Sequence, residues 1–225
     1  MRCIPEGLPR PQLLDIARLV DRYEMQNSLG AFLELWIKNS FHMTYAVNDE
    51  ESALDWLYIM FVFDHYYYFS AVASHLMWFS TGIDLEDAPE GFQSVLNEIS
   101  GARDYYLRPR LNAIHREYKA YVGGTKCQSS TCTTQEFVVG FFTRLLEKYK
   151  ILSPPQPSYR GLRLIAVFRF LTEFQEGLQE APPCLVGNCH YCDIDQNPEF
   201  DPSKLFHIED FKPGRPLALI PFRRP

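Results

Sequence analysis

The sequence has no long hydrophobic run. Its most apolar stretch covers residues 53–63 and contains Asp55. A helix that spans a bilayer needs about twenty mostly apolar residues, so the sequence predicts no membrane partner. The first residues lead into proline- and glycine-containing sequence rather than into the apolar core of a secretory signal. We therefore expect an intracellular protein, either cytoplasmic or nuclear.

Positive charge is also scarce. The 225 residues contain 22 Lys and Arg against 28 Asp and Glu, which gives a formal net charge of −6. A surface with this balance repels phosphate groups, and this argues against nucleic acid as a partner.

Motifs of the common enzyme classes are missing as well. The chain has no G-x-S-x-G nucleophile turn, no P-loop and no glycine-rich dinucleotide turn. Its histidines at positions 42, 65, 75 and 115 stand alone. We expect no catalytic residues, because an isolated histidine is more often a surface or core residue than a catalytic base.

Helical periodicity is what the sequence does have. Within residues 13–38, apolar side chains recur every three or four positions on both sides of the polar break at 26–28. This pattern predicts two helices that share an apolar side. Further helices are predicted at about 51–63 and 66–79, as one or two helices over 91–121, and after a capping residue at Thr133 and another at Ser158.

Strand signals are nearly absent, and the best short candidate is residues 217–222. The fold class is therefore predicted as all-α, a single helical domain of seven or eight helices. Residues 181–225 are rich in proline and show little periodicity, and they are predicted to form an irregular tail.

Six cysteines suggest one possible cofactor. Zinc is held by four thiolate or imidazole ligands, and closely spaced cysteine pairs supply two of them at little entropic cost. The candidate metal ligands are Cys127, Cys132, Cys184, Cys189 and Cys192, with His190 and His207 nearby in sequence. The alternative is that these cysteines are free thiols, in which case the protein has no cofactor.

The opening helices resemble the end of a fungal BTB/POZ domain. The resemblance is carried by residues 13–38, which read LLDIARLVDRYEMQNSLGAFLELWIK, with a looser similarity over residues 56–63. It implies that residues 1–40 are the last hairpin of a BTB fold, that 41–180 are a helical region packed with it, and that 181–225 are a tail. A complete BTB fold places a strand-rich half before these helices, and that half has no counterpart in the twelve residues before Leu13.

The function expected from this resemblance is that of a non-enzymatic protein–protein interaction module. It would bind a protein partner or a second copy of itself through Leu29, Phe32, Leu33 and Trp36. Two alternatives remain open, a small zinc-stabilised regulatory protein and an enzyme without a recognisable motif.

Overall fold

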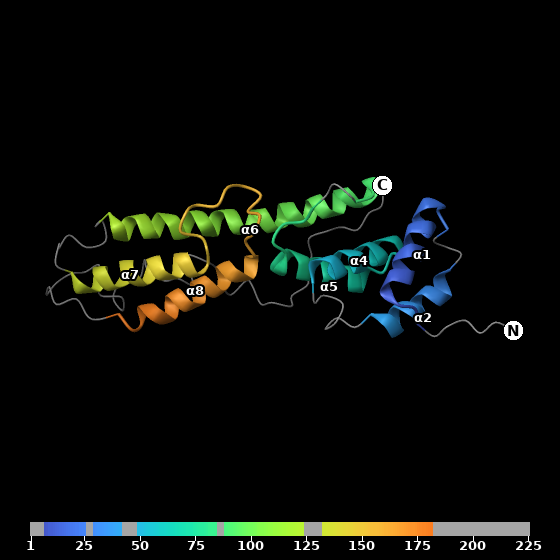
Figure 1. The fold of residues 1–225 in the computed structure, drawn as a ribbon, viewed down its shortest axis with the longest axis horizontal. Coiled ribbons are helices and arrows are strands. Elements are labelled where there is room, and N and C mark those ends of the chain that lie inside the picture. Colours follow the sequence, from blue (N-terminus) through green and yellow to red (C-terminus); the bar gives the residue numbers. More distant parts are fainter. Residues whose placement is uncertain (1–6, 26–28, 42–48, 85–87, 124–131, 182–225) are drawn as a thin grey trace. The chain divides into compact units, whose positions relative to one another are not determined.

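The computed structural model describes residues 7–25, 29–41, 49–84, 88–123 and 132–181. Over these ranges the protein is all-α, with seven helices and no strand (Figure 1). The predicted fold class is therefore confirmed. The chain divides into two compact units between Gly101 and Ala102, within the long helix α6. The predicted boundary at residue 40 stays a prediction, and the predicted tail lies outside the described residues apart from Ala181.

Helix α4 (Glu50–Val62) is the centre of the first unit. Asp49 caps it, because the Asp49 carboxylate accepts hydrogen bonds from the Ser52 backbone N–H at 2.7 Å and from the Ser52 hydroxyl at 2.6 Å. These bonds also lower the pKa of Asp49. Every residue from Trp56 to Val62 is buried, so α4 must have neighbours on several sides.

Helices α1 (Arg10–Arg22) and α5 (Tyr66–Phe79) both pack against α4. A hydrogen bond joins α1 to α4, with the Tyr58 hydroxyl donating to Asp21 at 3.0 Å. Asp64, in the left-handed region at φ 56°, makes the turn between α4 and α5 that the sequence predicts. Helix α2 (Gly30–Ser40) ends at Phe41, whose ring lies 5.0 Å from that of Trp56.

Helix α6 (Glu90–Val122) is one continuous helix through Pro109. The start of α6 belongs to the first unit, where the Phe92 ring lies 5.2 Å from Tyr58 and 5.3 Å from Phe61. Proline removes one helical hydrogen bond. Next to it, the Arg110 guanidinium donates to the Tyr106 carbonyl at 2.9 Å.

The second unit contains the rest of α6 with α7 (Thr133–Lys148) and α8 (Leu164–Leu178). Its core is aromatic, and the Phe142 ring lies 4.3 Å from Phe174 and 5.7 Å from Phe170. Gly177 allows close approach of α7, because a Cβ there would come within 2.1 Å of the Phe141 ring.

Two predicted helix caps are wrong. Helix α7 is capped by Cys132 instead of Thr133, and the Cys132 thiol accepts from the Gln135 backbone N–H at 3.4 Å. Helix α8 begins after Arg163, without a side-chain cap. Ser158 lies instead in the preceding turn, where its φ is 69°. Each cap was predicted from local spacing alone.

A buried arginine holds that turn in place. Arg103, on α6, is 2% exposed, and its guanidinium donates to the carbonyls of Ser158 at 3.3 Å, of Tyr159 at 2.8 Å and of Leu162. Tyr159 and Gly161 also have positive φ, at 38° and 83°. Left-handed backbone is costly for residues other than glycine, so the three hydrogen bonds stabilise a conformation that the turn would not otherwise favour.

We expect Arg103→Met to destabilise the second unit by about 3 kcal/mol, because it leaves several buried carbonyls without a donor. Urea unfolding followed by circular dichroism measures the change. Arg108→Met is the matched control, since Arg108 lies on the same helix with an exposed side chain. Equal stability of the two variants would contradict this role.

His115, also on α6, is buried, and its Nε2 has no hydrogen-bond partner within the described ranges. Burial lowers the pKa of His115, and the nearby Lys119 adds to the shift. The folded state therefore binds fewer protons than the unfolded state between the lowered pKa and the ordinary value of about 6.5. Stability should fall as the pH drops through this window.

We predict that His115→Leu flattens the dependence of unfolding free energy on pH below about 6.5, since it removes this proton uptake. Denaturant titrations at several pH values measure the slope. An unchanged slope in the variant would show that His115 does not contribute to it.

Candidate functional site

The apolar side chains of α1 fall on two faces, of which only one is covered. Leu13, Leu14, Ala17 and Val20 are buried, and α1 packs against α4. Leu19 and Tyr23, four residues apart, lie together on a second face and are 53% and 60% exposed. One neighbouring helix cannot cover both faces.

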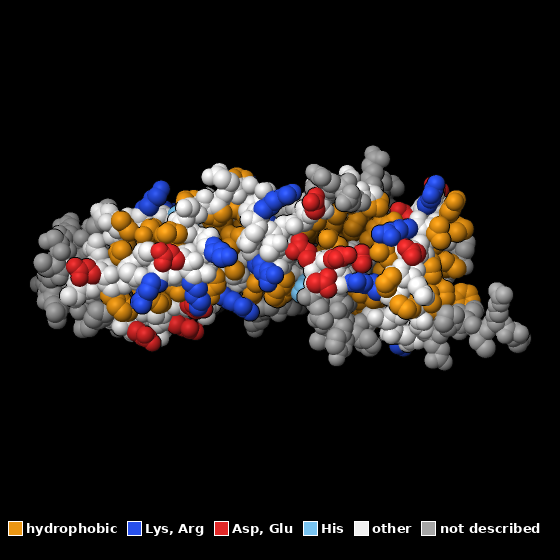
Figure 2. Space-filling model, viewed as in Figure 1, with side chains coloured by type: hydrophobic (Ala, Val, Ile, Leu, Met, Phe, Trp, Pro, Cys, Tyr) orange, Lys and Arg blue, Asp and Glu red, His pale blue; other side chains and the backbone are white. Residues whose placement is uncertain are grey.

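Three more exposed apolar side chains lie just after α1 and on α2. Met25, Phe32 and Leu35 are 42%, 39% and 43% exposed. We call Leu19, Tyr23, Met25, Phe32 and Leu35 the outer apolar face. Figure 2 shows apolar side chains gathered over α1 and α2 along the right-hand edge of that view.

The four residues predicted to bind a partner do not lie together on this surface. Phe32 is on the outer apolar face, and Leu29 is half-buried. Leu33 and Trp36 are only 5% and 9% exposed, which corrects their assignment from partner surface to core. The Phe32 ring stacks on Trp36 with 6.1 Å between centroids, so the buried tryptophan supports the exposed phenylalanine.

Sequence reasoning missed Leu19, Tyr23, Met25 and Leu35 as surface residues. A signal was present, because Leu13, Ala17 and Val20 already make a complete stripe. Leu19 and Tyr23 widen that stripe beyond what one packing partner covers. An apolar stripe that is wider than one packing partner can cover therefore indicates a second contact surface.

Charges around the outer apolar face are balanced. Residues 10–40 contain four acidic and four basic side chains. Arg18 pairs with Asp15 at 3.3 Å, and the Arg22 guanidinium lies 5.8 Å from the centre of the Tyr23 ring. The acidic excess lies elsewhere in the first unit, since residues 1–101 contain fifteen acidic and five basic side chains in total.

One acidic side chain of this unit, Asp55 on α4, pairs with Arg10 on α1 at 3.5 Å. Burial raises the pKa of Asp55, and the Arg10 charge opposes that shift. The pair therefore joins α1 to α4, with both side chains partly exposed.

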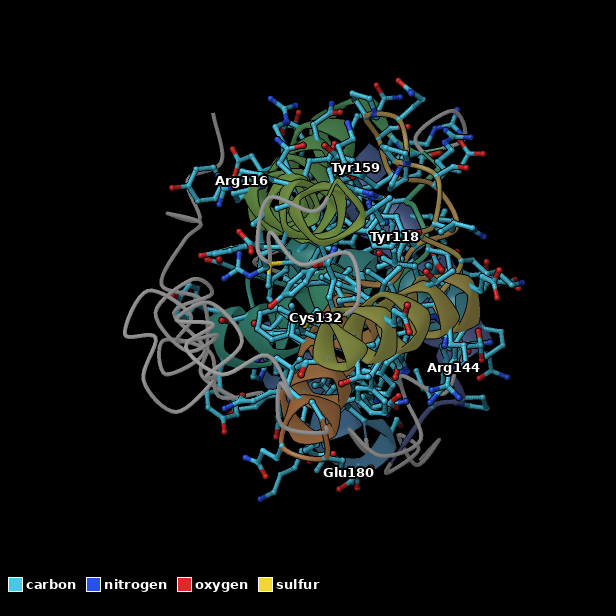
Figure 3. All side chains as sticks on the ribbon, turned by 90° about the vertical axis from the view of Figure 1, so that its left-hand side faces the viewer. Arg116, Tyr118, Cys132, Arg144, Tyr159 and Glu180 are labelled. Atoms are coloured by element: carbon cyan, nitrogen blue, oxygen red, sulfur yellow. The ribbon has the colours of Figure 1, made fainter. Side chains whose placement is uncertain are left out.

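Only one of the predicted zinc ligands can be placed. Cys132 is 2% exposed at the start of α7 (Figure 3). Cys127, Cys184, Cys189 and Cys192 lie outside the described residues, as do His190 and His207. No group of three or more potential metal ligands occurs in the part of the chain that the structure describes. The zinc site stays a prediction.

The second unit carries a polar cluster at Glu173. The Glu173 carboxylate accepts from the Tyr149 hydroxyl at 2.6 Å and from the Lys148 ammonium at 2.6 Å. Desolvation and the bond to Glu173 raise the pKa of Tyr149 to about 12. Hydrogen bonds from Lys148 and Tyr149 lower the pKa of Glu173. A phenol with a raised pKa keeps its proton near neutral pH, so this arrangement links α7 to α8 rather than activating a nucleophile.

Comparisons with known proteins give no match to a family model, to a curated protein or to a solved structure. The BTB/POZ resemblance therefore stays a prediction. None of the described helices is both long enough and apolar enough to cross a bilayer.

Leu33 and Leu35 provide a matched test of the two faces of α2. We expect Leu33→Ala to lower the free energy of unfolding by about 2–5 kcal/mol, because it leaves a cavity in the core. Leu35→Ala should change it by about 0.5 kcal/mol or less, since this side chain is largely exposed. Chemical denaturation measures both values, and equal losses would contradict the assignment.

Proposed function

We propose that this protein is a non-enzymatic protein–protein interaction module that binds its partner through the outer apolar face. The observation that carries the proposal is that five large apolar side chains of α1, α2 and the residues just after α1 are exposed, in a part of the first unit where Figure 2 shows apolar side chains gathered. Single exposed apolar residues are ordinary on a protein surface, whereas a contiguous group is typical of an interaction site.

The residue types on this face suit a binding surface. Tyr23 and Phe32 are aromatic anchors, which often contribute much of the binding energy of an interface. Trp36 supports the Phe32 ring from the core side, which limits the entropy lost when a partner orders that ring.

The charges near the outer apolar face and in residues 1–101 indicate what kind of partner would bind. The face itself is apolar and its charged neighbours are balanced, so contact favours an apolar segment. The acidic excess of residues 1–101 attracts positive charge and speeds its encounter. We therefore infer that the partner presents a short apolar segment flanked by lysine or arginine.

A displayed peptide library tests this proposal without knowledge of the partner. The full chain is the bait, and clones that also bind a Tyr23→Ser, Leu35→Ser variant are removed. Because both substitutions are neutral, the charge of the bait is unchanged. We expect the remaining clones to have an apolar core with flanking lysine or arginine.

Tyr67→Ser is the matched control, since Tyr67 is an exposed tyrosine of the same unit on α5. Clones that depend on the outer apolar face should bind this variant like the unchanged chain. The proposal fails if no clone distinguishes the face variant from the control, and its charge argument fails if the selected flanks are acidic.

A further inference from the structure

Charge along the chain is divided into three parts. Residues 1–101 carry a net charge of −10, with fifteen acidic and five basic side chains. Residues 102–211 contain thirteen of each sign. Residues 212–225 contain Lys212, Arg215, Arg223 and Arg224 and no acidic residue. The net charges therefore favour attraction between the last residues and residues 1–101.

The same basic segment contains an apolar core. Leu217, Leu219, Ile220 and Phe222 stand between Arg215 on one side and Arg223 and Arg224 on the other. Pro216 and Pro221 disfavour a helix here and favour an extended segment. This composition matches the ligand chemistry deduced above for the outer apolar face, an apolar segment with basic flanks.

We propose that residues 215–224 of this chain dock on the outer apolar face of the same chain and cover Leu19, Tyr23 and Phe32. The inference rests on the proposed function, because it assigns an internal competitor to the same binding surface. A partner must then displace the segment before it binds. The apparent affinity of the partner falls by the fraction of molecules whose face is covered.

The covalent connection permits this contact. Thirty-five residues separate Ala181, the last described residue, from Leu217, and an extended chain spans about 3.3–3.6 Å per residue. A tethered segment meets its binding surface at an effective concentration set by the linker, so docking within one chain needs no second molecule.

Hydroxyl-radical footprinting of the full-length protein tests the proposal from both sides. We expect Leu219→Ser with Phe222→Ser to raise the modification of Tyr23, Met25 and Phe32 several-fold while Tyr67 stays unchanged. In the reciprocal experiment, Tyr23→Ser with Leu35→Ser should raise the modification of Phe222. Tyr67→Ser should leave Phe222 unchanged.

Unchanged modification in both directions would overturn the proposal. A tenfold dilution shows whether the docked segment belongs to the same chain or to a second copy. Protection of Tyr23, Met25 and Phe32 should persist if the contact is within one chain. Loss of this protection on dilution would assign the segment to a second copy and overturn docking within one chain.

The outcome can be separated from that of the proposed function. Clones selected on the outer apolar face should bind the Leu219→Ser, Phe222→Ser chain more tightly than the unchanged chain. Equal binding to both chains, with equal footprints, would overturn the internal competitor and leave the interaction module standing. If both footprinting experiments give the expected changes but no selected clone depends on the outer apolar face, the result supports the internal contact and counts against an external partner.

Discussion

Burial of α4 is the constraint on which the first unit depends. Residues 56–62 of this helix are all buried, so no side of it can face water. Helices α1 and α5 and the start of α6 supply the neighbours, with Phe92 closing on Tyr58 and Phe61. The buried side chains of α1, which are Leu13, Leu14, Ala17 and Val20, make this contact. Leu19 and Tyr23 of the outer apolar face stay exposed.

This division separates the buried from the exposed apolar side chains of α1. Here the stripe containing Leu13 and Ala17 is satisfied by α4, and the stripe containing Leu19 and Tyr23 is open. The binding surface we propose consists of apolar side chains of α1, α2 and the residues just after α1 that stay exposed.

Much of the fold could be predicted from the sequence, because local patterns determine it. The helix at residues 66–79 follows from the periodicity of its apolar side chains. The continuity of α6 through Pro109 and the bonds from Arg103 to residues 158–162 could not be predicted in this way. They depend on groups that are adjacent only after folding.

The candidate site could not be predicted fully from the sequence for the same reason. Leu33 and Leu35 are both leucines on one apolar-rich helix, and composition does not say which of them faces the core. That choice depends on the direction in which α2 packs. The sequence indicated that the opening hairpin matters, whereas the structure identified Leu19, Tyr23, Met25 and Leu35 as its open surface.

The most direct test of this account is a methyl NOESY spectrum of the selectively labelled full-length protein. It reports which methyl groups of α1 lie close to protons of α4. The two-stripe arrangement predicts cross-peaks from the Leu13 and Ala17 methyls to α4 and none from the Leu19 methyls to α4. Cross-peaks between Leu19 and the aromatic protons of α4 would contradict the open outer face, and with it the proposed binding surface.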